Sequence, residues 1–234
     1  MVKIFADGAD LDSIKELAQN PIIKGFTTNP TLMRQAGVTD YRRFADEVTS
    51  VITDRPISFE VFADELDEME KQARVIASWA PNINVKIPIT NTRGESTAEV
   101  VRALSAEKIV VNVTAMFTMK HVRTVCDVLA PETHAILSVF AGRIADGGID
   151  PMPIMTEAAA HIRETRPNAE LLWASPREVL NVVQADQAGC GIITVTGGIL
   201  SKMKTIGKDM DEFSLDTVKM FYNDAQSAGY TIQD

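Results

Sequence analysis

The chain contains few of the residues that usually hold metals or form disulfide frameworks. It has 234 residues, of which two are cysteines and three are histidines. Cys126 and Cys190 have no metal-ligand spacing and cannot build a disulfide framework, so we expect two buried thiols in a reducing compartment. His121, His134 and His161 share no ligand spacing with one another or with the cysteines. We therefore predict that the protein uses neither a metal nor another cofactor.

Long apolar segments and an excess of basic charge are also missing. No stretch approaches the roughly 18 apolar residues that a membrane-spanning helix needs, and the first residues do not form a basic segment followed by an apolar signal core. The net charge is −9, from 23 basic and 32 acidic residues, whereas nucleic-acid binders are more often basic. The sequence therefore predicts a globular cytoplasmic protein with no membrane or nucleic-acid partner.

What the chain does have is a regular alternation of short apolar runs and segments with helical periodicity. Eight such runs begin near Val2, Gly25, Pro56, Asn82, Lys108, His134, Glu170 and Ile192. Asp10 and Asp64 are predicted to cap two of the helices that follow. Eight strand–helix units without a linker predict an α/β fold, a closed parallel (β/α)8 or TIM barrel. We expect residues 1–234 to form a single domain with C-terminal helices at about 200–234.

An open, doubly wound sheet is the alternative fold. Such a sheet usually carries a glycine-rich phosphate-binding turn after its first strand. Here the corresponding residues 6–10 read ADGAD, which would place Asp7 and Asp10 where a phosphate must lie. The barrel is therefore favoured over the open sheet.

Polar residues recur in one phase near the ends of the expected strands. Side chains alternate between the two faces of a strand, and active sites of such barrels lie at the C-terminal strand ends. One phase assignment directs eight polar residues inward: Asp7, Asn29, Glu60, Lys86, Asn112, Thr114, Ser138 and Ser175. The same assignment directs Phe62, Leu171 and Trp173 inward. Because buried polar groups need partners or a ligand, the pattern predicts a functional pocket.

Lys86 suggests the chemistry of that pocket. A lysine that points inward beside apolar neighbours either pairs with a carboxylate or serves as a neutral amine nucleophile. Such an amine adds to a ketone, and the resulting iminium accepts electrons from a breaking C–C bond, while Asp7 or Glu60 moves the protons. Arg143 and Arg177 follow the sixth and seventh strands, and with Ser175 they form a candidate phosphate site.

Four segments resemble the transaldolase family. Residues 25–32 (GFTTNPTL) resemble its strand-two signature, and residues 85–88 (VKIP) resemble its Schiff-base lysine segment. Residues 138–143 (SVFAGR) and 174–177 (ASPR) resemble its phosphate-binding segments. The short length resembles the subfamily that includes fructose-6-phosphate aldolases.

The resemblance implies a role for each matching residue. Lys86 would be the Schiff-base nucleophile and Asp7 the proton-transfer group, while Glu60 and Thr114 would position the catalytic water. Asn29 and Asn112 would bind a dihydroxyacetone unit. The residues implied to bind substrate are Thr27, Asn29, Asn112, Ser138, Phe140, Arg143, Ser175 and Arg177, of which the last three would hold the acceptor phosphate.

Two positions bear on the branch of the family. The aldolase branch typically has glutamine at the position of Glu60 and tyrosine at that of Phe140, so this chain resembles a transaldolase. That implies transfer of a dihydroxyacetone unit from a ketose phosphate to an aldose phosphate, in the pentose phosphate pathway. Cleavage to free dihydroxyacetone and glyceraldehyde 3-phosphate, or a Schiff-base aldolase for another ketose, is the alternative. Val139 and residues 195–198 (VTGG) depart from the family pattern and leave the sugar open.

Two other functions fit the residues less well. An isomerase that cradles phosphate on Gly197 and Gly198, with Glu60 as base, would leave Lys86 and Arg143 unused. A non-catalytic sugar-phosphate binding protein would be expected to have lost the lysine or its proton relay, and both are present here.

The segment after the eighth strand predicts self-association. It carries more apolar side chains than one docking stripe needs, including Phe213, Leu215, Val218, Phe221 and Tyr222. Short members of the family form rings with exchanged C-terminal helices. We therefore expect a homo-oligomer, a pentamer or a decamer.

Overall fold

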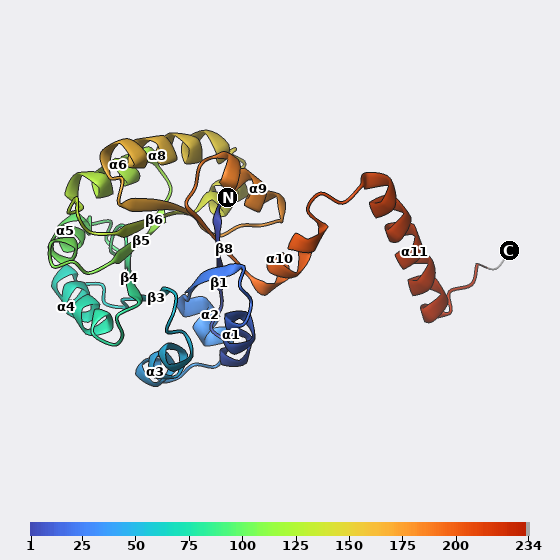
Figure 1. The fold of residues 1–234 in the computed structure, drawn as a ribbon, viewed down its shortest axis with the longest axis horizontal. Helices are drawn as coiled ribbons and strands as arrows, with labels where there is room; N and C mark the ends of the chain where they lie inside the picture. The colour runs from blue at the N-terminus through green and yellow to red at the C-terminus, as the bar shows by residue number, and fades with distance from the viewer. Residues whose placement is uncertain (233–234) are drawn as a thin grey trace. The chain divides into compact units, whose positions relative to one another are not determined.

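Eight parallel strands close into a barrel in the computed structural model, which describes residues 1–232 (Figure 1). The strands are β1 (Lys3–Asp7), β2 (Ile23–Thr27), β3 (Ile57–Glu60), β4 (Ile83–Pro88), β5 (Val111–Met116), β6 (Ala135–Val139), β7 (Ala169–Trp173) and β8 (Ile192–Val195). They follow one another in chain order, and β1 pairs with β8 to close the sheet. The predicted (β/α)8 barrel is confirmed, and the open-sheet alternative is wrong.

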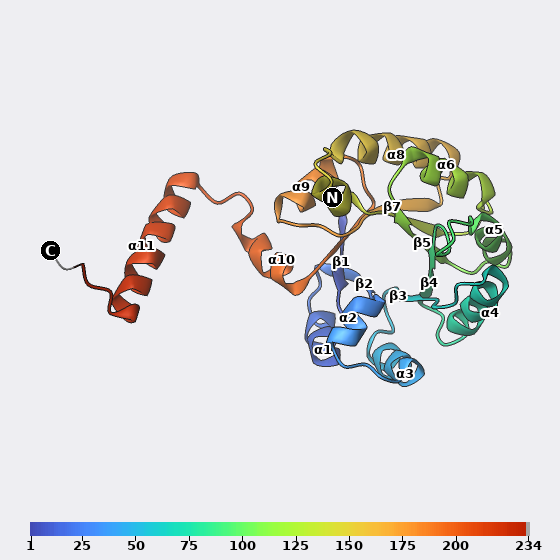
Figure 2. The ribbon, with the colours of Figure 1, turned by 180° about the vertical axis from the view of Figure 1, so that it is seen from behind.

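Helices surround the strands, as Figures 1 and 2 show from opposite sides. Those between strands are α1 (Leu11–Ala18), α2 (Pro30–Gln35), α3 (Tyr41–Val51), α4 (Leu66–Ala77), α5 (Ala98–Ala106), α6 (Met119–Val128), α7 (Ala141–Asp146), α8 (Met152–Thr165) and α9 (Leu180–Gln187). None of the helices within residues 1–232 is both long enough and apolar enough to cross a membrane.

The two helix caps expected from the sequence have different outcomes. The Asp10 carboxylate caps α1 by accepting a hydrogen bond from the Ser13 backbone N–H at 2.8 Å, as predicted. Asp64 does not cap α4, because the N-cap residue there is Glu65. The Asp64 carboxylate instead accepts the backbone N–H and the hydroxyl of Thr92, at 2.8 and 2.7 Å. It therefore ties the β3–α4 loop to the loop after β4.

An apolar plug fills the barrel below the polar strand ends. Its buried members are Phe5, Ile136, Leu172, Ala174 and Ile192, and Phe140 packs against them. Gly25 makes room for the largest of these side chains, since a Cβ atom there would lie 2.5 Å from Phe5 Cζ. The plug separates the polar strand ends above it from the Lys3–Glu170 ion pair at the N-terminal ends of the strands.

The predicted phase of the seventh strand is wrong. Leu172 and Ala174 point into the barrel, rather than Leu171 and Trp173. All four side chains are buried, because a parallel barrel strand is covered on both faces, and so the sequence offers no polar contrast to set the phase. The assignment depended on Ser175, whose φ of +61° breaks the alternation just after the strand.

Phe62 was also expected inside the barrel, and this prediction is wrong. β3 ends at Glu60, so the alternation does not continue to residue 62. The Phe62 ring is 51% exposed and lies 4.6 Å from the Tyr41 ring, between centroids.

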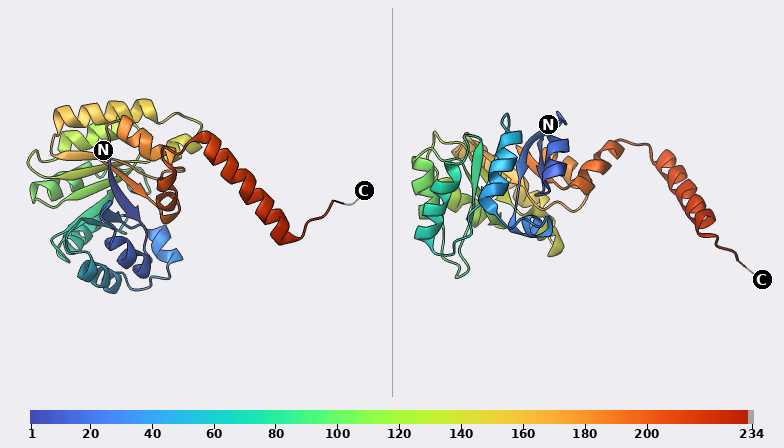
Figure 3. Two further views of the ribbon diagram at one scale, coloured as in Figure 1. Left: turned by 45° about the vertical axis from the view of Figure 1, so that its right-hand side comes forward. Right: turned by 90° about the horizontal axis from the view of Figure 1, so that it is seen from below.

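The chain divides into two units, Met1–Leu200 and Ser201–Asp234. α10 (Gly197–Lys202) and a short 3₁₀ turn (Met203–Thr205) precede α11 (Met210–Ala228), which Figure 3 shows as one unbroken helix. Asp209 caps its N-terminus, and Gly229 ends it at a φ of +66°. No residue of α11 is buried, although it carries large apolar side chains: Phe213, Leu215, Val218, Met220, Phe221 and Tyr222. The predicted C-terminal helices are confirmed, and a single domain over 1–234 stays a prediction.

Candidate active site

The polar residues at the C-terminal strand ends surround one cavity of about 460 Å³. The twelve residues expected at the site converge there with the exception of Arg177. Those that line it are Asp7, Thr27, Asn29, Glu60, Lys86, Asn112, Thr114, Ser138, Phe140, Arg143 and Ser175. They come from six strands and the segments that follow β2, β6 and β7, as the barrel geometry predicts.

Lys86 lies on the wall of this cavity, opposite Glu60 in the register between β3 and β4. Its Nζ is 3.2 Å from Glu60 Oε2 and donates a hydrogen bond to the Thr28 carbonyl at 2.7 Å. Lys86 is 8% exposed, so its side chain is largely removed from water, and Glu60 forms an ion pair with it. An amine becomes a nucleophile when it gives up a proton, and Glu60 is within reach to accept one.

Asp7 is a second carboxylate at the site, at the end of β1. Burial raises its pKa above the ordinary aspartate value, although the charge of Lys86 and a hydrogen bond from Thr27 act in the opposite direction. The Thr27 hydroxyl donates to Asp7 Oδ1 at 2.8 Å. A carboxyl with a raised pKa holds its proton more readily, as a group that donates and accepts protons in turn must do.

Two hydroxyls that the sequence analysis left without a role support these groups. Thr194 of β8 lines the cavity and is hydrogen-bonded through its hydroxyl to that of Thr27. Ser58 Oγ accepts a hydrogen bond from Asn112 Nδ2 at 3.1 Å, and Ser138 Oγ donates to Asn112 Oδ1 at 2.7 Å. The Asn112 amide is thus held from both sides. The inward phase of strand eight was the signal that could have found Thr194.

On the opposite side of the cavity, the turn after β6 lies directly against the end of β7. The Gly142 N–H donates to the Ala174 carbonyl at 3.3 Å, and a Cβ atom at Gly142 would lie 1.6 Å from the Ser175 carbonyl oxygen. Only glycine allows this approach. It brings Arg143 and Ser175 to the same part of the cavity wall.

The two arginines expected at a phosphate site differ in their surroundings. Arg143 lines the cavity, and its guanidinium lies over the Phe140 ring, 5.7 Å from the centroid. Arg177 is not among the lining residues. It forms an ion pair with Asp146 and donates to Ser175 Oγ at 2.9 Å. Asp146 therefore balances the charge of Arg177. Arg177 is linked to the cavity wall by its hydrogen bond to Ser175.

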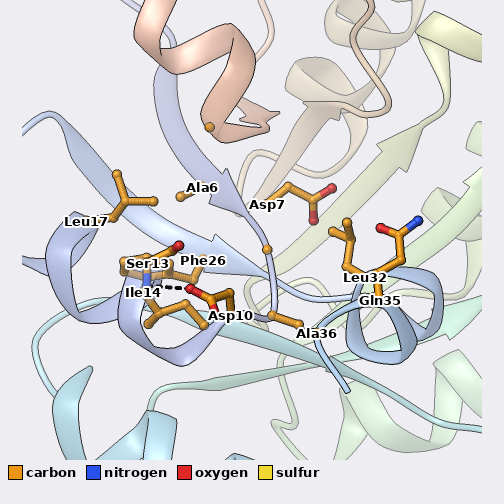
Figure 4. Close-up of a pocket in the computed structure, with 13 residues that line it drawn as sticks. Ala6, Asp7, Asp10, Ser13, Ile14, Leu17, Phe26, Leu32, Gln35 and Ala36 are labelled. Carbon is orange, nitrogen blue, oxygen red and sulfur yellow. Dashed lines mark hydrogen bonds between the residues drawn. The ribbon is translucent and has the colours of Figure 1, made fainter. Parts of the chain in front are cut away.

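A smaller cavity of about 390 Å³ lies on the other side of Asp7 (Figure 4). Asp7, Leu32 and Gln35 line both cavities, and the Asp7 carboxylate points toward Leu32 and Gln35 and away from Asp10. Asp10 is engaged in capping α1. Most of the other walls are apolar, with side chains of Ala6, Ala9, Ile14, Leu17, Phe26 and Ala36. The larger cavity therefore holds the groups that can carry out chemistry.

Histidine and cysteine lie outside this arrangement. Cys126 and Cys190 are free and buried, as expected for two thiols that form no framework. Within residues 1–232, no three or more His, Cys, Asp or Glu side chains are grouped so that they could hold a metal ion.

Comparison with known proteins gives the family. The model of the family described as transaldolase/fructose-6-phosphate aldolase matches residues 4–232. The chain belongs to this family. It is 34% identical over 202 residues to a probable transaldolase of Dehalococcoides mccartyi, covering 86% of this chain and 90% of that protein. It is 35% identical over 202 residues to a probable transaldolase of a Roseiflexus species, covering 86% and 88%. The suspected relationship is thereby confirmed.

A solved structure shows the same fold in a more distant protein. A putative phosphonomutase from Burkholderia cenocepacia superimposes with a TM-score of 0.59 and covers 88% of this chain and 91% of its own. The two sequences are 12% identical, so this likeness concerns the barrel alone.

The raised pKa of Asp7 predicts a pH-dependent stability. A carboxyl whose pKa is raised by folding stabilises the fold below its unfolded value, and this contribution is lost as the pH rises through the folded value. Asp7→Asn cannot ionise. We therefore expect its free energy of unfolding to exceed that of the wild type at neutral pH, with a difference that closes on acidification. Urea unfolding between pH 4 and pH 8 measures this.

Asp10→Asn is the matched control for that measurement. Hydrogen bonding to Ser13 lowers the Asp10 pKa, so its contribution is present above the ordinary value and is lost as the pH falls. Asparagine still caps a helix, so the variant removes the charge alone. Asp10→Asn should lower stability at neutral pH. A decrease of the same sign for Asp7→Asn would show that burial does not control Asp7.

Proposed function

We propose that the protein is a class I transaldolase that transfers a dihydroxyacetone unit from a ketose phosphate to an aldose phosphate. The observation that carries the proposal is the Lys86 amine on a cavity wall, 3.2 Å from Glu60 and in the same cavity as Asp7. The family membership supports phosphorylated sugars as substrates. A structural ion pair would account for the contact alone, but not for the eleven site residues around one cavity.

In the proposed reaction Lys86 Nζ attacks the ketose carbonyl, and loss of water gives a protonated imine. Glu60 accepts the amine proton and, with Thr114, holds the water that leaves and later returns. Asp7 takes the proton from the substrate C4 hydroxyl as the C3–C4 bond breaks, so the bond electrons flow into the iminium and form an enamine. The fragment that begins at C4 becomes an aldehyde and leaves as an aldose phosphate. The aldose acceptor then restores the C–C bond with Asp7 returning the proton, and water releases the new ketose.

The remaining residues bind substrate in this proposal. Asn29, Asn112 and Ser138 hold the hydroxyls of the three-carbon unit, and Thr27 contributes chiefly by orienting Asp7. Arg143 and Ser175 hold the phosphate. Arg177, which donates to Ser175, completes that site from behind.

The proposal extends to the protein's setting. We propose a cytoplasmic enzyme of the pentose phosphate pathway, which binds neither nucleic acid nor membrane and needs no cofactor. Two buried free thiols support the compartment. We also propose a homo-oligomer, a pentamer or a decamer, supported by the exposed apolar side chains of α11. Light scattering at micromolar concentration would report a monomer if this part is wrong.

Covalent trapping tests the mechanism. Sodium borohydride with fructose 6-phosphate should reduce the imine and leave a three-carbon adduct on Lys86, located by peptide mass spectrometry. Lys86→Met keeps the length of the side chain but supplies no amine, so turnover should be nearly abolished. Lys3→Met is the control, because Lys3 is also an inward lysine paired with a glutamate, Glu170. Labelling at a lysine other than Lys86 would exclude the proposed nucleophile.

The phosphate site is tested by a substrate comparison. Arg143→Ala should reduce kcat/KM for phosphorylated acceptors by about 10- to 150-fold, because a hydrogen bond to a charged group is worth roughly 1.5–3 kcal/mol. Non-phosphorylated aldehydes should be nearly unaffected. Equal losses for both acceptors would mean that Arg143 supports the fold and does not bind phosphate.

Phe140 distinguishes the transferase from an aldolase. A phenylalanine offers no hydroxyl to help water protonate the enamine, so an aldehyde acceptor should capture it first. Release of dihydroxyacetone without erythrose 4-phosphate should be slower than transfer with it, and Phe140→Tyr should raise release. A wild-type release rate equal to the transfer rate would assign the protein to the aldolase alternative.

A further inference from the structure

The C-terminal end of β3 extends past the end of β2, its neighbour in the sheet. β2 pairs with β3 only at Phe26–Ile57 and Thr27–Ser58. Beyond Thr27 the chain leaves the sheet, because Asn29 caps α2 by accepting the Leu32 N–H at 3.0 Å. The backbone of β3 therefore has no strand neighbour on this side after Ser58.

Glu60 is the residue affected by this gap. Backbone groups of a strand face its two neighbours alternately. Ile57 and Val61 bond to the β4 side, through the carbonyls of Asn82 and Lys86. The Ser58 carbonyl faces the β2 side, where it accepts the Thr28 N–H at 3.2 Å. The N–H and C=O of Glu60, two residues further, face the same side, where β2 has already ended.

The hydroxyl of Tyr41 fills this gap. It accepts a hydrogen bond from the Glu60 N–H at 2.8 Å and donates one to the Glu60 carbonyl at 2.9 Å. A tyrosine hydroxyl can do both because it is at once a donor and an acceptor. Burial raises the pKa of Tyr41 above the ordinary tyrosine value, so the hydroxyl keeps its proton at neutral pH.

The Tyr41 ring is itself fixed. It is the first residue of α3, and its ring packs edge-on against Phe59 and Trp79, with centroids 5.9 and 5.4 Å apart. It also contacts Phe62. The hydroxyl is therefore a rigid substitute for the missing stretch of β2.

We propose that Tyr41 is a positioning residue that fixes Glu60, and thereby its carboxylate, against Lys86. The inference rests on the proposed function for the roles of Glu60 and Lys86. A carboxylate that must exchange a proton with an amine 3.2 Å away tolerates little displacement. Tyr41 acts through main-chain bonds and does not touch the substrate.

Tyr41→Phe tests the inference, since it removes the hydroxyl and keeps the ring. We expect kcat to fall by up to about 100-fold, with KM for the ketose changed by less than about twofold, because displacement affects the reacting groups and not substrate contacts. In a Glu60→Ala background the same substitution should have no further effect on kcat, since no carboxylate remains to be placed. Multiplicative losses in that cycle would overturn the inference.

Trp79→Phe is the control for packing. It weakens the aromatic cluster around Tyr41 and leaves the hydroxyl, so we expect a lower Tm with kcat and the pH–rate profile unchanged. If Tyr41→Phe also lowers Tm and leaves kcat and the pH–rate profile unchanged, the role of Tyr41 is purely structural.

A readout that needs no turnover separates this inference from the proposed function. Crystal structures of the wild type and of Tyr41→Phe give this readout, because they report the contact between Lys86 Nζ and Glu60 Oε2, which is 3.2 Å here. We expect the Glu60 carboxylate to be displaced from this contact in Tyr41→Phe and to be kept in Trp79→Phe. Failure of borohydride trapping in the wild type would refute the Schiff base alone, whereas an unchanged Lys86–Glu60 contact in Tyr41→Phe would refute the positioning role.

Discussion

The ion pair between Lys86 and Glu60 constrains the upper half of the barrel. A charge removed from water is tolerated only where a partner and further hydrogen bonds replace the solvent. The β3–β4 register supplies the carboxylate, and the turn after β2 supplies the Thr28 carbonyl. Burial at Asp7 works in the opposite direction and favours the protonated acid. A buried carboxyl with a raised pKa is suited to donate and accept a proton in turn.

The sequence determined the fold and most of the site because both depend on repeating patterns. The order of strands and helices predicted the closed barrel, and period-two alternation brought Asp7, Glu60 and Lys86 into one cavity. The same reasoning failed where the repeat is interrupted. Ser175 has a left-handed φ, and the apolar residues of β7 on both faces gave no contrast that would have corrected the phase.

Contacts of side chains with residues distant in the chain could not be predicted from the sequence. Tyr41 bonds to the backbone of a residue 19 positions away, and no local motif marks such a tyrosine. Asp64 has the composition of a helix cap, yet the nearby loop with Thr92 offers it two donors. Arg177 matches a phosphate-binding segment, but Asp146, 31 positions earlier in the chain, forms an ion pair with its guanidinium. In each case the contact depends on which residues the fold places beside the side chain, and residue type alone does not determine it.

The way Asn112 is held has a consequence for stereochemistry. A side-chain amide has two donor hydrogens and two acceptor lone pairs. Ser138 occupies one lone pair and Ser58 one hydrogen, which prevents the amide from flipping. One donor and one acceptor remain, on fixed sides of the group. A ligand hydroxyl that bonds to both must approach from one direction. The hydroxyls of two epimeric sugars point in different directions, so they present themselves to Asn112 unequally.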